Sequence, residues 1–561
     1  MSQQRTRTRT NKKKLKIIPL GGLHEIGKNL TVVEYGEDIL LIDCGMAFPE
    51  NDMFGVDVVI PDFTYLRENS HKIKGLIITH AHEDHIGAVP FLVRHFNVPI
   101  YGTKLALGFI KLKLKEHKLE ARLNEIQPGE LIRIGCFKIE AIHTTHSDAD
   151  SLAYAITTPV GVIFHTGDFK IDLTPIDGAT IDFSRVSQIG DDGVLLLMSD
   201  STNSMRKGYS VSERSVAVSL ENIFQKNDKR IIIATFSSNV HRVQSIINIA
   251  AKNGRKVAFS GRSMENMVKL ATELGYMTIP AGCQIDISQV RKYKDKELCI
   301  LTTGSQGEPM SALSRMAFGE HKQISIKPGD CVILSSSPIP GNELTIDRVL
   351  NSLLEKGAEV IYSEIADVHA SGHACQEELK IIQTMLKPKF FMPVHGEFKH
   401  LMAHAELARQ LGMPDSHILI AENGSVVELT KDKARVLPET VTVGEIMVDG
   451  LGVGDVGAVV LNERRGLAEA GVITVTVVYD SATNELIAGP EMHTRGFTYM
   501  KEYGEFLSGS KEAARKALEK AGRDGVTSIP ELRAICKNAV RKYVSDTLQR
   551  YPVVLPIVMK I

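Results

Sequence analysis

Several side chains that bind metals stand together in the segment THAHEDHIGAVP, which begins at residue 79. The spacing HxHxDH within it is made by His80, His82, Asp84 and His85. Imidazole and carboxylate groups bind zinc, and they bind manganese as well. A lone histidine is more often structural than a ligand, but a cluster this dense behind an apolar run predicts a metal site. Two ligand pairs in so short a space can serve two cations.

The elements that would position these groups are short apolar segments that end at polar residues. DILLIDCG, GLIITH, GVIFHTGD and VLLLMSD begin at residues 38, 75, 161 and 194, and an Asp or His stands at or near the end of each. Such segments are predicted to be buried strands. Strand ends present reactive groups on loops that a rigid sheet holds. The further ligand candidates near strand ends are His146, Asp168 and His395, with His143 and His165 as competitors, and Asp168 could bridge both metals.

A different pattern starts near residue 212. Strand-like segments such as RIIIATFSS and CVILSSSP alternate with helical ones such as HRVQSIINIAAKNG, which predicts βαβ units and a parallel sheet. FFMPVHGE, from residue 390, again resembles a strand that ends in histidine. We therefore expect this α/β unit to be inserted into an outer domain that resumes after it.

The expected domains follow from these patterns. They are a disordered basic tail at 1–13, an outer domain at 14–213 and 373–445, an insert at 214–372, a linker at 446–457 and a small α+β domain at 458–561. The alternative for the basic tail is a phosphate-binding arm. The Gly and Pro content of residues 437–457 indicates the linker.

The bulk composition limits the class of protein. The chain has 561 residues, too many for one core, and its 43% hydrophobic and 24% charged residues are typical of globular domains. A net charge of -1 neither indicates nor excludes nucleic-acid binding. Seven scattered cysteines without a CxxC pair favour reduced thiols in the cytoplasm. No apolar run reaches the length of a membrane span, so no membrane partner is expected.

The HxHxDH segment, a later histidine, the aspartate of HTGD and a final histidine together resemble the metallo-β-lactamase superfamily. The resemblance implies an α/β fold, an αββα sandwich with two metals at one edge of its sheets. It implies that one metal is held by His80, His82 and His146, the second by Asp84, His85 and His395, and that Asp168 bridges them. Asp43 in LLIDCG matches the supporting aspartate that orients the ligands. Two divalent ions are expected, zinc first, with manganese or magnesium as alternatives.

The insert resembles the β-CASP module of nucleic-acid-processing members of that superfamily. Its motifs match Asp200 in LLLMSDSTN, His373 in VHASGHA and His395 in MPVHGE, and a histidine in the last position is similar to the RNA-processing branch. The leaving 3′-oxygen of a phosphodiester needs a proton or a positive neighbour, and His373 is the candidate, oriented by Asp200. A helix cap is the alternative role for Asp200.

The whole chain resembles the bacterial ribonuclease J family in LGGLHEIGKN, MAFPENDMFGVDVVIPD, HTGDFKID and VHASGHACQEEL. One departure is HSDADS, where the family usually has Ile-Pro-Asp-Ser after the histidine. The resemblance implies a metal-dependent ribonuclease of RNA maturation and decay. It would be a 5′-to-3′ exonuclease that prefers 5′-monophosphate ends, and an endonuclease too. Assembly through the C-terminal domain into a homodimer or homotetramer is implied, with a paralogue or other RNA-decay proteins as further partners.

Polar loops of the insert are candidates for phosphate binding, because hydroxyls and backbone N–H groups at helix N-termini suit anions. TFSSNVHR offers Ser237, Ser238, His241 and Arg242, and HASGH offers His369, Ser371 and Gly372. TGSQGEP and SSPIPGNE could line the same cleft, although each loop alone could be an ordinary turn. Phe48 is expected either to stack on a base or to be a core aromatic.

Two other functions remain open. A small-molecule hydrolase of the same fold would act on a thioester or a lactam, but such a substrate needs no large insert. A scaffold with a degenerate site would bind RNA without cutting it, and the complete ligand set argues against that.

Overall fold

The computed structural model describes residues 14–50, 52–308, 310–338, 342–480, 482–483, 485–497 and 503–561. The basic tail, and parts of TGSQGEP and SSPIPGNE, lie outside the described residues. The described residues form two compact units, one within residues 1–47 and 60–445 and the other within residues 48–59 and 446–561. In the described part, no helix has the length and hydropathy that a membrane crossing requires.

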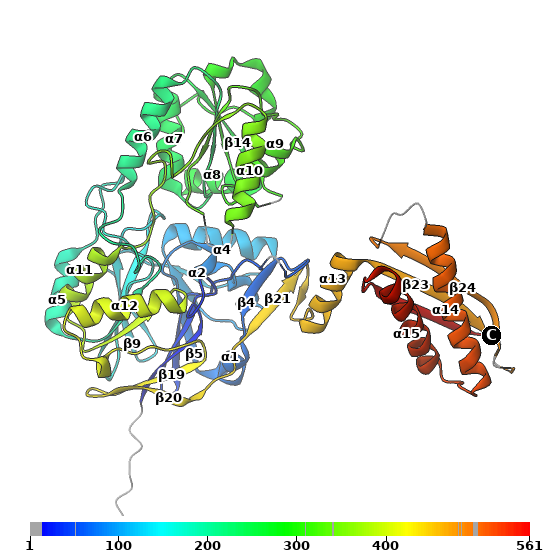
Figure 1. Cartoon of the computed structure of the whole chain (residues 1–561). Helices are drawn as coiled ribbons and strands as arrows, with labels where there is room; N and C mark the ends of the chain where they lie inside the picture. The colour runs from blue at the N-terminus through cyan, green and yellow to red at the C-terminus, as the bar shows by residue number, and fades with distance from the viewer. Residues whose placement is uncertain are drawn as a thin grey trace, which may run out of the picture. The chain divides into compact units, whose positions relative to one another are not determined.

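Two sheets packed face to face form the centre of the first unit (Figure 1). The eight-stranded sheet has the order β20-β19-β1-β2-β3-β5-β6-β7, with β1 Leu15–Gly21, β2 Leu30–Tyr35, β3 Asp38–Ile42, β5 Ile73–Ile77, β6 Ile100–Gly102, β7 Leu123–Glu125, β19 Ser425–Leu429 and β20 Ala434–Thr440. The six-stranded sheet has the order β18-β12-β11-β10-β9-β8, with β8 Leu131–Ile134, β9 Phe137–His143, β10 Leu152–Thr157, β11 Val162–His165, β12 Val194–Asp200 and β18 Phe390–Val394. Side chains from both sheets, among them Ile42, Ile77, Leu152 and Leu196, share one buried core.

Helices cover the outer faces of the sandwich. On the side of the eight-stranded sheet they are α1 Thr64–Glu68, α2 Glu83–Ile86, α3 Val89–Val93 and α4 Lys104–Glu116, and on the other side they are α5 Phe183–Asp192, α11 Gln376–Leu386 and α12 Phe398–Gln410. Val186, Leu379 and Ala405 of the second group pack against Phe164 and Leu197 of the six-stranded sheet. The αββα sandwich is therefore confirmed.

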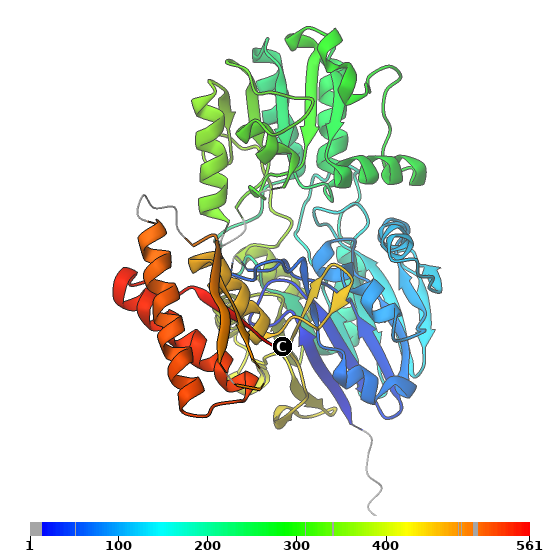
Figure 2. The same ribbon diagram turned by 90° about the vertical axis from the view of Figure 1, so that its right-hand side faces the viewer.

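The insert is a parallel sheet with helices on both faces (Figure 2). Its order is β14-β15-β13-β16-β17, with β13 Ile231–Ala234, β14 Lys256–Ser260, β15 Leu298–Thr302, β16 Cys331–Leu334 and β17 Glu359–Ile361. One face packs on α6 Glu213–Lys226, α7 Val240–Lys252 and α8 Arg262–Leu274, and the other on α9 Ala312–Phe318 and α10 Glu343–Glu355. The insert also contains the short 3₁₀ turns η2 Ile287–Lys292 and η3 Asp295–Glu297. The outer domain contains two more, η1 Ser70–Lys72 and η4 Asp415–His417. The predicted inserted parallel sheet is confirmed.

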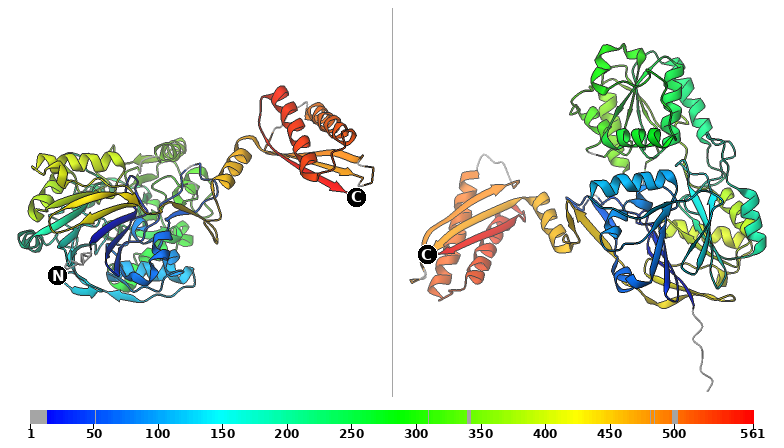
Figure 3. Two further views of the ribbon diagram at one scale, coloured as in Figure 1. Left: turned by 90° about the horizontal axis from the view of Figure 1, so that it is seen from below. Right: turned by 180° about the vertical axis from the view of Figure 1, so that it is seen from behind.

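The second unit contains the expected small α+β domain (Figure 3). Its three-stranded sheet has the order β24-β23-β25, with β23 Val472–Tyr479, β24 Leu486–Arg495 and β25 Val553–Lys560, and the domain's helices are α13 Ala458–Ala470, α14 Tyr503–Arg523 and α15 Ile529–Leu548. Strand β23 alternates buried and half-buried residues, so one face is the core side, and α14 and α15 pack on it.

The segment expected as a linker, 446–457, is not a plain connection. It carries most of β21 Glu445–Asp449 and all of β22 Gly452–Val453, which pair antiparallel and join β4 Val58–Pro61 in a small sheet. Its glycines serve a tight turn, where Gly450 has a φ of 59°. Residues 48–59 also belong to this unit, where Arg464 donates to the carbonyl of Phe54 at 2.8 Å.

Candidate metal centre

Strand order explains why distant residues meet at one edge of the sandwich. Strands β11, β12 and β18 are parallel neighbours, so the residues after them emerge on the same side. Asp168, Asp200 and His395 stand at or just after the ends of these three strands. The HxHxDH segment follows β5 of the facing sheet and runs into the short helix α2.

The seven predicted ligands form two groups that share one carboxylate. One group is His80, His82, His146 and Asp168, and the other is Asp84, His85, Asp168 and His395. Within each group, one candidate ligand atom per residue lies within 4.8 Å of the others. This is the division that the resemblance implies. His143 instead contacts the carbonyl of Ala179 at 3.2 Å, and His165 Nδ1 accepts from Gly167 N at 3.0 Å, so neither competitor enters these groups.

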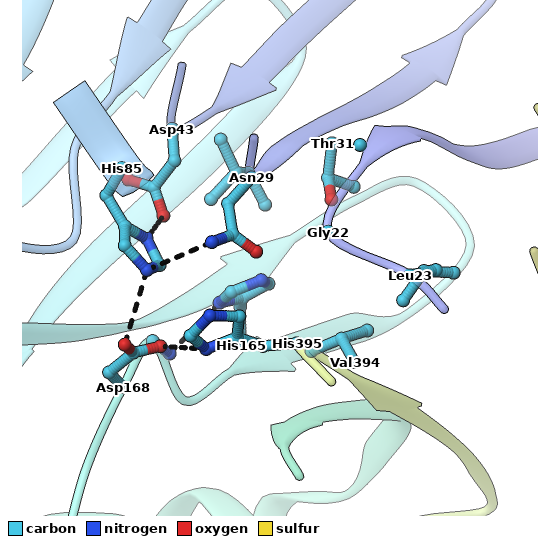
Figure 4. Close-up of a pocket in the computed structure, with 13 residues that line it drawn as sticks. Gly22, Leu23, Asn29, Thr31, Asp43, His85, His165, Asp168, Val394 and His395 are labelled. Carbon is cyan, nitrogen blue, oxygen red and sulfur yellow. Dashed lines mark hydrogen bonds and ion pairs between the residues drawn. The ribbon is translucent and has the colours of Figure 1, made fainter. Parts of the chain in front are cut away.

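The orientation of the imidazoles suits cations. His146 Nδ1 lies 2.6 Å from the carbonyl oxygen of Gly372, and His85 Nδ1 lies 2.8 Å from Asp43 Oδ2. Each ring therefore directs its other nitrogen into the group, where His85 Nε2 is 3.3 Å from Asp168 Oδ2 (Figure 4). Nε2 of His80 is buried without a hydrogen-bond partner, and Nε2 of His395 is buried with Asp84 Oδ2 at 3.3 Å. Buried polar atoms without a hydrogen-bond partner are uncommon, and a divalent ion would satisfy that of His80.

Burial favours the neutral form of three of these imidazoles, which is the form that binds metals. It lowers the pKa of His80 and His146 well below the usual value, and it lowers the pKa of His82 to about 4. His85 and His395 differ, because nearby carboxylates outweigh burial. Asp168, Asp84 and Asp43 raise the pKa of His85 well above its usual value, and Asp168 and Asp84 raise the pKa of His395 to about 10.

Two residues of the centre have strained backbone conformations. Asp43 has a φ of 59° and His395 a φ of 54°, a region that costs free energy for residues other than glycine and is found at functional sites. In this conformation the Asp43 carboxylate makes three polar contacts. It accepts from Thr79 N at 2.8 Å and Thr79 Oγ1 at 2.9 Å while it holds His85. Asp43 therefore lies where an orienting residue is needed.

His373 and Asp200 form a pair beside the metal groups. His373 Nδ1 lies 2.8 Å from Asp200 Oδ2 and 3.9 Å from Asp168 Oδ2. Burial disfavours charge on this ring, but Asp200 raises the pKa of His373 overall. The other oxygen of Asp200 accepts from the backbone N and the hydroxyl of Thr202, at 2.9 and 2.8 Å. The carboxylate is thereby fixed in orientation.

Sequence reasoning missed three polar residues that hold this arrangement. Asn29 donates to the carbonyl of Asp84 at 3.0 Å, and its amide lies 3.2 Å from His85 Nε2. Thr202 fixes Asp200, and Asn203 donates to the carbonyl of His373 at 3.0 Å. Asn29 is the last residue of LGGLHEIGKN, and Thr202 and Asn203 lie in SDSTN. The motifs quoted from the sequence therefore included these three residues, but they did not indicate which residues they contact.

The phosphate-binding candidates lie in two loops. Ser237, Ser238 and His241 are half-buried at the start of α7. Ser371 Oγ accepts from Asn203 Nδ2 at 2.8 Å, and His369 Nδ1 is buried without a partner. Gly372 must be glycine, because an added Cβ would lie 2.5 Å from the His146 ring. Phe48 is 69% exposed, so it is not the core aromatic of the alternative.

Arg242 does not face a ligand in this structure. Its guanidinium is buried, donates to both oxygens of Glu213 at 2.6 and 2.7 Å, and also donates to Ser335 Oγ and the carbonyl of Val368. The arginine thus ties α6, at the entry to the insert, to the segment that leaves it. The prediction that Arg242 contacts a phosphate is therefore wrong for this structure, because its guanidinium is paired with the Glu213 carboxylate.

Four family descriptions match the chain. The metallo-beta-lactamase superfamily matches residues 25–234, and the ribonuclease J beta-CASP domain matches residues 228–353. The Zn-dependent metallo-hydrolase RNA specificity domain matches residues 358–420, and the ribonuclease J C-terminal domain matches residues 459–561.

Similar proteins match over nearly the full length. Ribonuclease J 1 of Streptococcus pyogenes serotype M3 is 42% identical, over 97% of either chain. Ribonuclease J2 of Bacillus subtilis is 40% identical, over 98% of this chain and 99% of the relative. Ribonuclease J of Thermus thermophilus is 44% identical, over 97% of this chain and 95% of the relative. This chain belongs to the ribonuclease J family.

A solved structure agrees with the fold alone. A protein of unknown function from Enterococcus faecalis superposes with a TM-score of 0.51 at 16% identity, over 76% of this chain and all of that one.

One departure from the ribonuclease J pattern has a visible structural role. In HSDADS, Asp148 Oδ2 accepts from the backbone N of Ala81 at 2.8 Å, between two predicted ligands. Asp150 Oδ2 accepts from the hydroxyl of Tyr276, in the insert, at 2.5 Å. Asp148, in the altered part of the loop, therefore supports the ligand loop, and Asp150, in the Asp-Ser end that matches the family, contacts the insert.

Proposed function

We propose that this chain is a metal-dependent ribonuclease that hydrolyses RNA phosphodiesters. The observation that carries the proposal is the pair of ligand groups sharing Asp168, with the His373–Asp200 pair beside them, in a chain that matches the ribonuclease J family along its length. Bound there, two divalent ions, zinc by preference with manganese or magnesium as alternatives, would neutralise the phosphate and supply hydroxide at neutral pH.

The chain's own residues account for the departure of the leaving group. Because Nδ1 of His373 is engaged by Asp200, the proton given to the leaving 3′-oxygen would come from Nε2. Asp200 would stabilise the charged imidazole before transfer and keep its ring in place. Asp43 would act earlier, by holding His85 ready for a cation.

A finer proposal concerns the 5′ end of the RNA. Ser237 and Ser238 supply hydroxyls at the start of α7, and the segment from His369 to Gly372 leads directly to the contact with His146. A terminal phosphate held by these groups would sit at a fixed distance from the metal groups. The chain would then release mononucleotides from 5′-monophosphate ends, and it would cut internally when the pocket is empty.

A comparison of RNA ends tests both levels of the proposal. Initial rates would be measured on one RNA sequence with monophosphate, triphosphate or hydroxyl at its 5′ end, with and without a chelator. We expect chelator-sensitive cleavage that is fastest on the monophosphate, because a triphosphate brings more charge and bulk than a few donors accommodate. Ser238→Ala should weaken this preference more than internal cleavage, with the exposed Ser288→Ala of the insert as control.

Other outcomes would favour the competing functions. Equal rates on all three ends, with products of mixed length, would contradict the end pocket but not the ribonuclease. Hydrolysis of a thioester or a lactam without RNA cleavage would favour the small-molecule hydrolase. RNA binding without cleavage by the metal-loaded chain would favour the scaffold.

Location and assembly are also part of this proposal. All seven cysteines are free thiols, which fits the cytoplasm. We place assembly into a homodimer or homotetramer in the C-terminal domain, with a paralogue or other RNA-decay proteins as possible partners of the same surface.

A further inference from the structure

A buried glutamate joins three segments of the catalytic region. Glu378 is fully buried in the first turn of α11, and its carboxylate accepts four hydrogen bonds. Oε1 accepts from Ile171 N and Ser210 Oγ, both at 2.7 Å. Oε2 accepts from Ser210 N at 2.7 Å and Cys375 N at 2.8 Å. Charge-assisted bonds of this kind are stronger than neutral ones.

Helix capping explains only one of these four bonds. A glutamate at the third helical position commonly accepts from the backbone N of the N-cap residue, here Cys375. The other three donors belong to two loops outside the helix. Ile171 follows Asp168 by three positions, and Ser210 lies in the loop that follows Asp200.

The three segments lead directly to catalytic residues. Ala374 donates to the carbonyl of Phe169 at 2.6 Å, so the backbones next to His373 and Asp168 are bonded to each other. The loop after Asp200 runs along the same segment. Gln376 N donates to the carbonyl of Arg206 at 2.9 Å, and Glu377 N donates to that of Gly208 at 3.2 Å. Glu378 closes this network at its far end.

We propose that Glu378 is a positioning residue for the reaction, which sets His373 against Asp200 and Asp168 by fastening the three loops that carry them. This inference rests on the proposed ribonuclease activity and on the role of His373 as proton donor. The hydrogen bonds of Glu378 join Ile171, Ser210 and Cys375 and none of the predicted ligands, so in this proposal it acts through the geometry of His373. A displacement of about 1 Å at a catalytic group can lower a rate by about 10²-fold.

The substitution Glu378→Gln tests the carboxylate with little change of volume. In the place of Oε1, the NH₂ group would face the Ile171 N–H, so that hydrogen bond is lost and the Ser210 hydroxyl would have to accept instead of donate; in the place of Oε2 it would face two backbone N–H donors, and both bonds would be lost. We expect unchanged metal content and a kcat on RNA lower by about 10- to 10²-fold, with KM little changed. Bis(p-nitrophenyl) phosphate should be hydrolysed at a rate near that of the unmodified chain, because its leaving group needs no proton.

Two further variants keep the test decisive. Ser210→Ala removes only the hydroxyl donor, so it tests the same network should Glu378→Gln not fold, and it should produce a smaller loss of the same kind. Glu297→Gln is the matched control, because Glu297 Oε2 accepts from Lys294 N at 2.9 Å in an exposed capping contact of the insert. It should leave both activities unchanged.

A double-mutant cycle separates positioning from general stabilisation. If Glu378 acts through His373, then His373→Ala combined with Glu378→Gln, or with Ser210→Ala, should be no slower on RNA than His373→Ala alone. Additive losses would overturn the proposal, as would equal losses on RNA and on the activated diester, or full activity of Glu378→Gln. A failure of the proposed function would look different, because the unmodified chain itself would not cut RNA.

Discussion

At the scale of single residues, the centre depends on which nitrogen of each imidazole is already engaged. Contacts with Asp43 and with the carbonyl of Gly372 fix the rings of His85 and His146, so each presents its other nitrogen. His80 Nδ1 similarly lies 3.0 Å from Thr79 Oγ1. The ligand set is therefore oriented before any ion binds, which reduces the reorganisation that binding requires.

The shared carboxylate gives an ordered prediction for metal content. Asp168→Asn should lower the occupancy of both ions, because Asp168 belongs to both ligand groups, whereas His82→Ala should mainly affect one. Both should nearly abolish RNA cleavage. Elemental analysis of the purified variants checks whether Asp168→Asn loses more metal than His82→Ala, and His143→Ala is the control that should keep its metal. Full metal content and activity in Asp168→Asn would remove that residue from the ligand set.

His373 should separate chemistry from metal binding. His373→Ala should keep its metal content yet lose on the order of 10²–10⁴ in rate on RNA, the usual range for a general acid or base. The matched measurement is the rate on an activated phosphodiester, which should fall much less. If metal is lost while the fold is intact, His373 is a ligand, a role that its place in a third group with Asp168, Asp200 and His395 would also allow.

At the scale of elements, residues at strand ends were predictable, whereas of the residues that support them only Asp43 was, through the resemblance. An apolar run that ends in His or Asp is visible in the sequence, so Asp168, Asp200 and His395 could be assigned to one sheet edge. Glu378 and Arg242 act through partners that lie 168 and 29 positions away in the chain. Which donors meet a buried carboxylate depends on how loops converge, and no local spacing records that.

The buried pair of Arg242 and Glu213 gives a prediction about acid stability. Glu213 is buried, yet Arg242 lowers its pKa to about 2, so the charged pair stabilises the fold above the usual pKa of 4.5 and this contribution is lost as pH falls from there through 2. Glu213→Gln leaves a buried guanidinium without its partner, so it should cost about 3–5 kcal/mol at neutral pH.

Urea unfolding of the insert at neutral and acid pH checks this prediction. The difference between the unmodified chain and Glu213→Gln should shrink as pH falls from about 4.5 to 2, because acid removes the same charge that the substitution removes. Glu221 lies on α6, as Glu213 does, and forms a solvent-exposed ion pair with Lys252 of α7, so Glu221→Gln should change stability little at either pH. A constant difference in stability across this pH range would show that the Arg242–Glu213 pair is not the source of the stability lost in acid.

At the scale of the whole molecule, the C-terminal sheet exposes apolar side chains. Helices α14 and α15 pack on one face, and the other carries Leu555, Ile557 and Met559, which are 54%, 39% and 45% exposed. These three alternate along β25, the last strand in the order β24-β23-β25. In the described part of the chain β25 pairs only with β23, so its other edge also offers backbone donors and acceptors.

This combination predicts that the chain assembles through β25. A chain that ends near Gly450 should shift in light scattering from an oligomer to a monomer, and Ile557→Lys should weaken assembly in the complete chain, because a charge on the apolar face opposes its burial. Asn538→Lys adds the same charge on the exposed side of α15 and should leave the mass unchanged. If the shortened chain remains an oligomer, the interface lies in the first unit, and the exposed strand must be explained by another partner. If the shortened chain is a monomer but Ile557→Lys leaves the oligomer intact, then the subunits associate by pairing of strand edges, since a side chain on the open face would not interrupt those backbone hydrogen bonds.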